Sequence, residues 1–144
     1  MRALILNGPN LNLLGVREPE VYGRTTFAEL ERLCRAWAEE LGLQLDLFQS
    51  NHEGALLDRL HEAIGKVDFG IVNPGALTHT SIALRDAIAG VGIPIIEVHL
   101  SNIYAREEWR RRSVISEVCR GVISGLGVQG YRLALQAGPL LTQG

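Results

Sequence analysis

The sequence lacks any long uninterrupted apolar run, and this argues against a membrane protein. Its first apolar stretch, residues 3–6, is broken by Asn7, Gly8 and Pro9. That break comes too early for the apolar core of a signal peptide and far too early for a membrane span. We therefore expect a cytoplasmic protein with no membrane partner.

Cysteine is scarce. The two cysteines, Cys34 and Cys119, have neither CxxC spacing nor the nearby histidines that a zinc site uses. We expect both to be reduced, small core residues, and we expect no metal.

A surplus of charge is also missing. The chain has 14 Lys and Arg against 16 Asp and Glu, a formal net charge of −2, so no overall basic field would attract nucleic acid. The length of 144 residues, with 47% hydrophobic and 21% charged positions, predicts one compact domain spanning 1–144. A small charged substrate is compatible with this composition.

The phosphate-binding motifs of common cofactor proteins are absent. There is no GxxxxGK[ST] loop and no GxGxxG after the first apolar run. A flavodoxin-type phosphate loop would be rich in serine or threonine where Asn10 and Asn12 stand, and a phosphorelay receiver would need acids where Asn7 and Asn73 stand. We expect no cofactor.

Apolar runs alternate with segments of helical period along the whole chain. Thr26 and Glu29 form a capping-box pair, with Gly42 placed to end that helix, and Ser50 with Glu53 repeats the pair ahead of a second helix. We expect a third helix to open near Thr78. The helix that Thr26 begins is expected at about 26–41, and a closing helix at 128–136. Strands are expected at 3–6, 43–48, 69–72, 93–98 and 118–123.

This alternation predicts right-handed crossovers and a parallel sheet covered on both faces. We expect an α/β, flavodoxin-like three-layer sandwich with a five-stranded parallel sheet, and a loose tail at 138–144.

Polar residues follow the predicted strands, at the edge where open parallel sheets bind ligands. The segments are NGPNLN at 7–12, QSNH at 49–52, NPG at 73–75 with THT at 78–80, and EVHLSN at 97–102. Ordinary turn chemistry is the alternative explanation, but amides, hydroxyls and histidines at four strand ends favour a site.

Glu97 and His99 are two residues apart, so on a strand their side chains share a face. The carboxylate could then orient the imidazole as a general acid. A structural ion pair at a strand end is the alternative.

His79 and Asp86 are seven residues apart and would share a face if one regular helix spans both. They could then bind hydroxyl groups. Taken alone, Asp86 beside Arg85 is more typical of a solvated surface charge.

Arg17 and Tyr22 lie in a loop bounded by Gly15 and Gly23. A guanidinium near a phenol favours the phenolate, so the pair could provide a general base on a lid at about 13–25. On the pair alone, a surface turn capped by Tyr22 with a solvated Arg17 is the simpler interpretation.

Together these segments resemble one family, the type II 3-dehydroquinate dehydratases. The segments that carry the resemblance are NGPNLNLLG at 7–15, REP at 17–19, YG at 22–23, QSNHEG at 49–54, NPGA at 73–76, THTS at 78–81, LRD at 84–86 and IEVHLSN at 96–102. It extends through REE at 106–108 and GY at 130–131, with Trp109 a conservative packing change where relatives often carry phenylalanine.

The resemblance implies reversible loss of water from 3-dehydroquinate to give 3-dehydroshikimate, in the shikimate pathway or in quinate catabolism. It assigns Tyr22 as the phenolate that removes a proton beside the ketone and His99 as the acid that protonates the departing hydroxyl. Arg17 would hold Tyr22 ionised, Asn12 would stabilise the enolate through a water, and Glu97 would orient His99.

The resemblance also implies how the substrate is held. Asn73 and the backbone amides of Leu100 and Ser101 would bind the carboxylate, while His79, Asp86 and Arg110 would bind ring hydroxyls. Relatives receive the residue matching Asp86 from a neighbouring subunit and assemble as dodecamers of trimers, so a homododecamer is implied here.

A free phenol is almost entirely protonated near neutral pH, so a phenolate needs about 3 to 4 kcal/mol of differential stabilisation. One partly exposed cation rarely provides that much. We therefore expect the lid to be mobile without substrate and to close over it, excluding water. A non-catalytic module that binds a polyhydroxylated acid is the second hypothesis, and a structural assembly protein is a weaker third.

Overall fold

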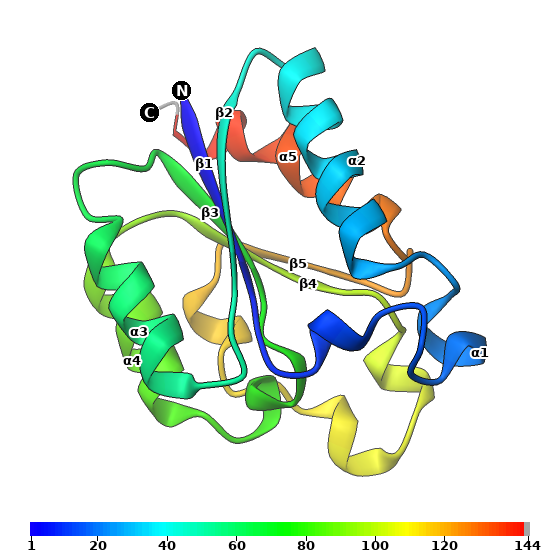
Figure 1. Cartoon of the computed structure of the whole chain (residues 1–144). Coiled ribbons are helices and arrows are strands. Elements are labelled where there is room, and N and C mark those ends of the chain that lie inside the picture. Colours follow the sequence, from blue (N-terminus) through cyan, green and yellow to red (C-terminus); the bar gives the residue numbers. More distant parts are fainter. Residues whose placement is uncertain (143–144) are drawn as a thin grey trace.

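A five-stranded parallel sheet forms the centre of the chain in the computed structural model, which describes residues 1–142 (Figure 1). The strand order is β2-β1-β3-β4-β5, the doubly wound order of flavodoxin-like folds. The strands are β1 (Arg2–Asn7), β2 (Gln44–Gln49), β3 (Phe69–Asn73), β4 (Ile95–His99) and β5 (Gly121–Ser124). The predicted fold class is confirmed.

Two helices cover each face of the sheet (Figure 1). Helices α2 (Phe27–Glu40) and α5 (Gln129–Leu141) pack on one face, and α3 (Glu53–Glu62) and α4 (Ile82–Val91) pack on the other. A short helix, α1 (Pro19–Tyr22), and five 3-10 turns occupy the connections: η1 (Leu11–Leu13), η2 (Gly75–His79), η3 (Ile103–Ala105), η4 (Glu108–Arg111) and η5 (Ser116–Val118). No helix within the described residues is long and apolar enough to cross a membrane.

Helix α2 begins and ends where its sequence signals predict. The Thr26 hydroxyl accepts a hydrogen bond from the Glu29 backbone N–H at 3.1 Å, which satisfies a donor of the first turn. Gly42, with φ of 71°, provides the left-handed residue after the last turn. The amphipathic face of α2 is thereby held against the sheet.

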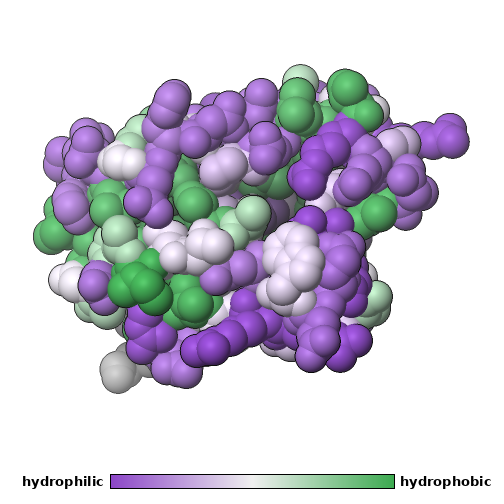
Figure 2. Space-filling view, turned by 90° about the horizontal axis from the view of Figure 1, so that it is seen from below, coloured by the Kyte–Doolittle hydropathy of each residue, from purple (hydrophilic) through white to green (hydrophobic). Residues whose placement is uncertain are grey.

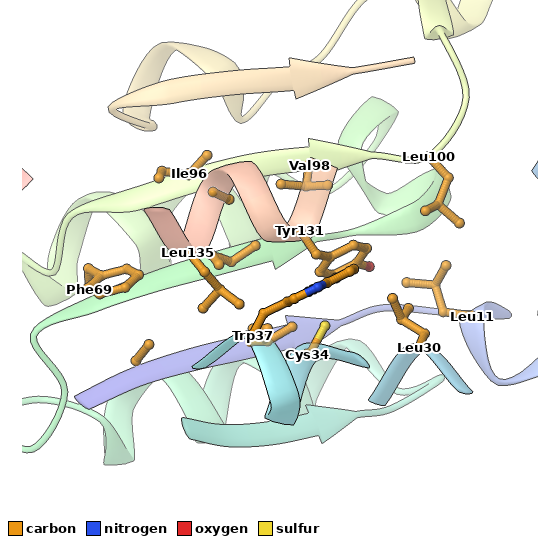
Figure 3. Close-up of a cluster of buried hydrophobic side chains, with 14 of the residues drawn as sticks. Leu11, Leu30, Cys34, Trp37, Phe69, Ile96, Val98, Leu100, Tyr131 and Leu135 are labelled. Atoms are coloured by element: carbon orange, nitrogen blue, oxygen red, sulfur yellow. The ribbon is translucent and has the colours of Figure 1, made fainter. Parts of the chain in front are cut away.

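The sheet separates two apolar clusters, as expected of strands buried on both faces. The cluster under α2 and α5 includes Cys34, Trp37, Phe69 and Tyr131 (Figure 3). Burial raises the pKa of the Cys34 thiol to about 12, assisted by the charge of Glu31. Cys34 is free and buried as predicted, and the free, half-buried Cys119 packs against the other cluster.

Two expected helix starts are wrong. Helix α3 begins at Glu53, and Ser50 does not cap it but accepts the His52 backbone N–H at 3.0 Å in a turn. The helix expected near Thr78 begins later, because η2 intervenes and the Ser81 hydroxyl, which accepts the Leu84 N–H at 2.9 Å, caps α4. His79 and Asp86 are therefore not on one regular helix.

The ends of the chain also differ from expectation. Strand β5 begins at Gly121 instead of 118, because Ser116–Val118 form a turn that directs Ser116 toward the sheet. The expectation of a loose tail is wrong for residues 138–141, because α5 continues to Leu141. Gly138, which suggested a break, is required there since a Cβ would lie 2.0 Å from the Phe69 ring. Residues 143–144 lie outside the described part.

Candidate active site

A cavity of about 520 Å³, including the part open to solvent, lies where β1, β3 and β4 end. Its lining includes most of the sequence-predicted site: Arg17, Tyr22, Asn73, His79, His99, Leu100, Ser101 and Arg110. The surface seen from the end of the molecule where β1 ends is mostly hydrophilic, with apolar residues in separate groups (Figure 2).

The end loops of β1 and β3 approach each other closely beneath this cavity. The Gly8 N–H donates to the Asn73 carbonyl at 2.8 Å. A Cβ on Gly8 would lie 2.5 Å from the Pro74 carbonyl oxygen, so only glycine allows this approach.

Glu97 and His99 point to the same side of β4 and are hydrogen-bonded to each other, as their spacing predicts. Glu97 is completely buried, and His99 is nearly so but lines the cavity. Because an ionised carboxylate only accepts hydrogen bonds, the imidazole N–H donates to Glu97, which fixes the ring's orientation.

Three hydroxyl groups also bind the Glu97 carboxylate. Ser116 donates at 2.6 Å, Thr78 at 2.9 Å and Ser113 at 3.2 Å. Burial would raise the pKa of Glu97, but the hydrogen bonds from His99, Ser116 and Thr78 outweigh burial and lower that pKa. A fully buried carboxylate is thus kept charged next to His99. No spacing in the sequence predicts that these three hydroxyls meet at Glu97.

Two guanidinium groups lie close to the Tyr22 ring. The Arg17 guanidinium carbon is 4.9 Å from the centre of the Tyr22 ring, as the loop spacing suggested, and that of Arg106 is 5.1 Å from it. Arg106 also donates a hydrogen bond to the Tyr22 hydroxyl at 2.8 Å. A phenolate at this position would be stabilised by both charges.

Arg106 is the principal site residue that the sequence reasoning missed. It lies just after η3, lines the cavity, and also contacts Glu18 at 3.7 Å and the Ser101 hydroxyl at 3.4 Å. Its position seven residues after His99, in a charged segment following a polar strand end, was the available signal.

His79 and Arg110 lie in the wall of the cavity, each held by a neighbour. His79 Nδ1 donates to the Arg112 carbonyl at 2.7 Å, and its ring packs edge-on against Trp109 at 5.6 Å between ring centres. Arg110 is ion-paired with Glu107. These contacts leave a ring nitrogen and guanidinium N–H groups for ligand oxygens.

Three expected site residues do not line the cavity: Glu97, which is buried behind His99, and Asn12 and Asp86. Asn12 is exposed on η1, next to the cavity residue Leu11, and accepts a long 3.5 Å hydrogen bond from the Gln49 amide. Asp86 lies on α4 in a shallow surface groove shared with α3, where Leu57, His61 and Ile64 are neighbours. Within one chain, Asp86 therefore contributes to a different surface.

Among residues 1–142, no group of three His, Cys, Asp or Glu side chains is arranged to hold a metal ion. The cavity instead combines a phenol beside two cations, an imidazole on a buried carboxylate, and amide and guanidinium donors. This set can remove one proton, donate another and bind an anionic ligand.

Comparisons with known proteins agree on one family. The family model described as dehydroquinase class II matches residues 1–138. The catabolic 3-dehydroquinase 1 of Neosartorya fischeri is 59% identical over 133 residues, 92% of this chain and 89% of that protein. The 3-dehydroquinate dehydratase of Gloeobacter violaceus is 56% identical over 137 residues, 95% of this chain and 86% of that protein.

A solved structure gives the same result. The crystal structure of the type II dehydroquinase from Butyrivibrio crossotus superposes with a TM-score of 0.95 at 43% identity. The alignment covers 96% of this chain and 97% of that chain.

Proposed function

Because this chain belongs to the class II dehydroquinase family, we propose that it removes water from 3-dehydroquinate with Tyr22 as the base and His99 as the acid. It is a hydro-lyase, and its substrate is the one its relatives' names give. The contact of Arg106 and Arg17 with Tyr22, in the cavity that His99 also lines, is the observation that carries the proposed roles.

In the first step, the Tyr22 phenolate takes a proton from the carbon beside the ketone. The electron pair of the broken C–H bond moves toward the carbonyl oxygen and forms an enolate, which Asn12 stabilises through a water. Arg17 and Arg106 lower the free energy of the phenolate that must be present beforehand, because both charges face the ring.

In the second step, the enolate collapses and the C–O bond to the leaving hydroxyl breaks. His99 donates its proton to that hydroxyl, which departs as water. The new O–H bond partly offsets the energy needed to break the C–O bond. Glu97 orients His99 and stabilises its cationic form. Transfer of the proton gained by Tyr22 to His99 restores the starting state.

Asn73 and the backbone amides of Leu100 and Ser101 hold the carboxylate in this proposal, and His79 and Arg110 hold ring hydroxyls. All five line the cavity. Arg110 presents a guanidinium to oxygen atoms. These contacts place the reacting carbon and the leaving hydroxyl between Tyr22 and His99.

The reaction is tested by mixing the purified protein with 3-dehydroquinate and following ultraviolet absorbance. Elimination creates a carbon–carbon double bond conjugated with the ketone, and this enone absorbs where the substrate does not. A binding module with the same pocket gives no absorbance change, so the assay separates the two hypotheses.

Asp86 belongs to this proposal as a residue supplied by a neighbouring subunit of a homododecamer of trimers. Its place in an apolar groove on α3 and α4, away from the chain's own cavity, supports a role at a subunit contact. The groove contains Leu57, Ala83 and Ala87 beside its single carboxylate, and apolar surface of this kind is favourable to cover.

Mixing two inactive variants tests the arrangement. Subunits with Tyr22→Phe and subunits with Asp86→Ala are dissociated, combined in equal amounts and reassembled. If Asp86 acts on a neighbour, about a quarter of the sites regain both groups, since each subunit choice is random in a closed ring. No recovery would show that Asp86 acts within its own chain.

A further inference from the structure

Tyr131 is a completely buried tyrosine that the proposed mechanism does not use. It lies on α5, and its ring packs in the apolar cluster between α2, α5 and the sheet. Its hydroxyl points toward the end of the cluster where Leu11 and Leu100 lie, and both of these residues line the cavity (Figure 3). A buried tyrosine hydroxyl needs hydrogen-bond partners within the protein.

The partners are two buried asparagines at neighbouring strand ends. The Tyr131 hydroxyl donates to the Asn7 Oδ1 at 2.6 Å, and the Asn73 Nδ2 donates to the Tyr131 oxygen at 2.9 Å. Asn7 ends β1 and Asn73 ends β3, and the two are paired in register. Tyr131 thus connects α5 to two adjacent strands at the edge that carries the cavity.

A backbone group determines the direction of this chain of hydrogen bonds. The Gly75 N–H donates to the Asn73 Oδ1 at 3.2 Å. Because only the oxygen of an amide accepts, the Asn73 Nδ2 must face Tyr131. The phenol has one proton, so Tyr131 accepts from Asn73 and must donate to Asn7.

One N–H of Asn73 is not used by these contacts. Nδ2 carries two protons, one of which is bound to Tyr131, and no atom of residues 1–142 accepts the second. Asn73 lines the cavity, at the strand end where the proposed carboxylate lies. With Oδ1 turned to Gly75, the amide presents a donor to a bound anion instead of a repelling oxygen.

We propose that Tyr131 is a positioning residue that holds the Asn73 amide with its free N–H toward the substrate carboxylate. This inference rests on the proposed function, because Asn73 is a carboxylate ligand only there. Without the phenol oxygen, the Asn7 Oδ1 and the Asn73 Nδ2 both lose a buried partner. The Asn73 amide then keeps only the 3.2 Å contact with the Gly75 N–H, so it is held less firmly and can also adopt orientations that present Oδ1 to the anion.

The principal test is steady-state kinetics of Tyr131→Phe, which removes only the hydroxyl. We expect KM to rise about tenfold, the effect of losing one hydrogen bond to a charged group. We expect kcat to stay within about twofold, because the carboxylate is bound equally in ground and transition states. The matched control is Tyr104→Phe, since Tyr104 is 54% exposed and does not line the cavity.

A double-mutant cycle separates positioning from simple support of the fold. In an Asn73→Ala background there is no amide to orient, so adding Tyr131→Phe should change KM by less than about twofold. An unchanged KM for the single Tyr131→Phe variant would overturn the inference. So would a Tyr131→Phe penalty of the same size in both backgrounds, or one confined to kcat.

Calorimetric titration with quinate keeps this inference separate from the reaction. Quinate has the same carboxylate and ring but no ketone, so it binds without eliminating. If the wild type shows no turnover yet binds quinate about tenfold more tightly than Tyr131→Phe does, the reaction proposal fails and the positioning inference stands. If the wild type neither turns over nor binds quinate, both fail.

Discussion

Tyr22 has two cationic neighbours, and one of them also contacts its oxygen. The guanidinium groups of Arg17 and Arg106 both lie over the ring, and Arg106 in addition donates directly to the phenolic oxygen. A hydrogen bond to an anionic oxygen is charge-assisted, while a cation over a ring face interacts mainly with the ring's quadrupole. Arg106 should therefore stabilise the phenolate at least as strongly as Arg17 does.

Removing either arginine should lower turnover more than substrate affinity. Arg17→Ala and Arg106→Met should each reduce kcat by about 100-fold with a much smaller change in KM, because each loss lowers the fraction of Tyr22 that is phenolate before the proton is removed. Initial rates of enone formation measure both constants.

The matched control is Arg111→Met, since Arg111 is exposed on η4 and does not line the cavity. Equal losses of kcat and substrate affinity in the Arg17 variant would contradict its role. A normal kcat in the Arg106 variant would restrict the role to Arg17.

For individual residues, contacts within one strand were predictable from the sequence, and contacts between distant segments were not. The Glu97–His99 pair follows from the two-residue period of a strand. Arg106 and Tyr22 are 84 residues apart, and Tyr131 and Asn73 are 58 apart. No periodicity connects such positions, so they required the folded chain.

Among the elements, the segment between η1 and α2 is weakly anchored. No residue between Leu14 and Leu30 is buried. Arg106 provides the main contacts between this segment and the chain after β4, through Tyr22 and Glu18. Glu18, which precedes α1, has φ of 40°, a left-handed conformation that is unfavourable for a residue with a side chain. Both features are typical of a segment that opens locally.

Limited trypsin digestion checks this prediction. Cleavage after Arg17 and Arg24 should be fast without ligand, slow with saturating 3-dehydroquinate, and faster still in Arg106→Met, which loses the contacts with Tyr22 and Glu18. If the unliganded wild type resists cleavage as well as the liganded form does, the mobile-lid prediction is wrong.

Helix α5 offers a prediction about packing. An alanine at 138 would place its Cβ 2.0 Å from the Phe69 ring, although alanine is the better helix former. Gly138→Ala should therefore lower the free energy of unfolding by about 1 to 3 kcal/mol, as overpacked cores do.

The matched control is Gly54→Ala in α3, where nothing lies within 4 Å of the added Cβ. It should leave stability unchanged or raise it by up to about 1 kcal/mol. Urea unfolding of both variants measures the difference, and equal effects at the two positions would contradict the packing argument.

The elements themselves were largely predictable, because the apolar runs and the Thr26 cap are local signals. The errors arose where a side chain that could cap a helix binds elsewhere. Thr78 donates to Glu97 and Ser50 forms a turn, so neither begins a helix. Gly138 suggested a helix end but serves a close helix–sheet contact.

For the whole molecule, the doubly wound sheet explains why the site forms where it does. Parallel strands end at one edge, so the polar segments after β1, β3 and β4 meet there. The sequence order of strands and helices was sufficient to predict this edge. It could not show the groove that contains Asp86, because a surface formed by α3 and α4 depends on how the two helices pack.

The buried acids of the core predict a loss of stability in alkali. Burial, with the Glu31 charge, raises the pKa of Cys34 from 9.0 to about 12, and burial also raises that of Tyr131. Below pH 9 the thiol is protonated in both the folded and unfolded states, so its contribution to the free energy of unfolding is fully present. Between pH 9 and 12 only the unfolded state ionises, and stability falls as pH rises.

Urea unfolding at several pH values measures this slope. Between about pH 9.5 and 11, the wild type should lose roughly 1.4 kcal/mol per pH unit more than Cys34→Ala, the linkage for one proton. The comparison uses slopes, so the cavity left by the smaller side chain does not affect it. Parallel curves for the two proteins would show that the Cys34 thiol does not contribute.

The central claim is that the Tyr22 phenolate removes the proton, and the most direct test is the rate of enone formation by Tyr22→Phe. Phenylalanine preserves the ring that Arg17 and Arg106 contact but cannot accept a proton. We expect steady product formation by the wild type and none above background by Tyr22→Phe, with quinate affinity in the variant within a few-fold of wild type. Dehydration by Tyr22→Phe at a rate near that of the wild type would contradict it.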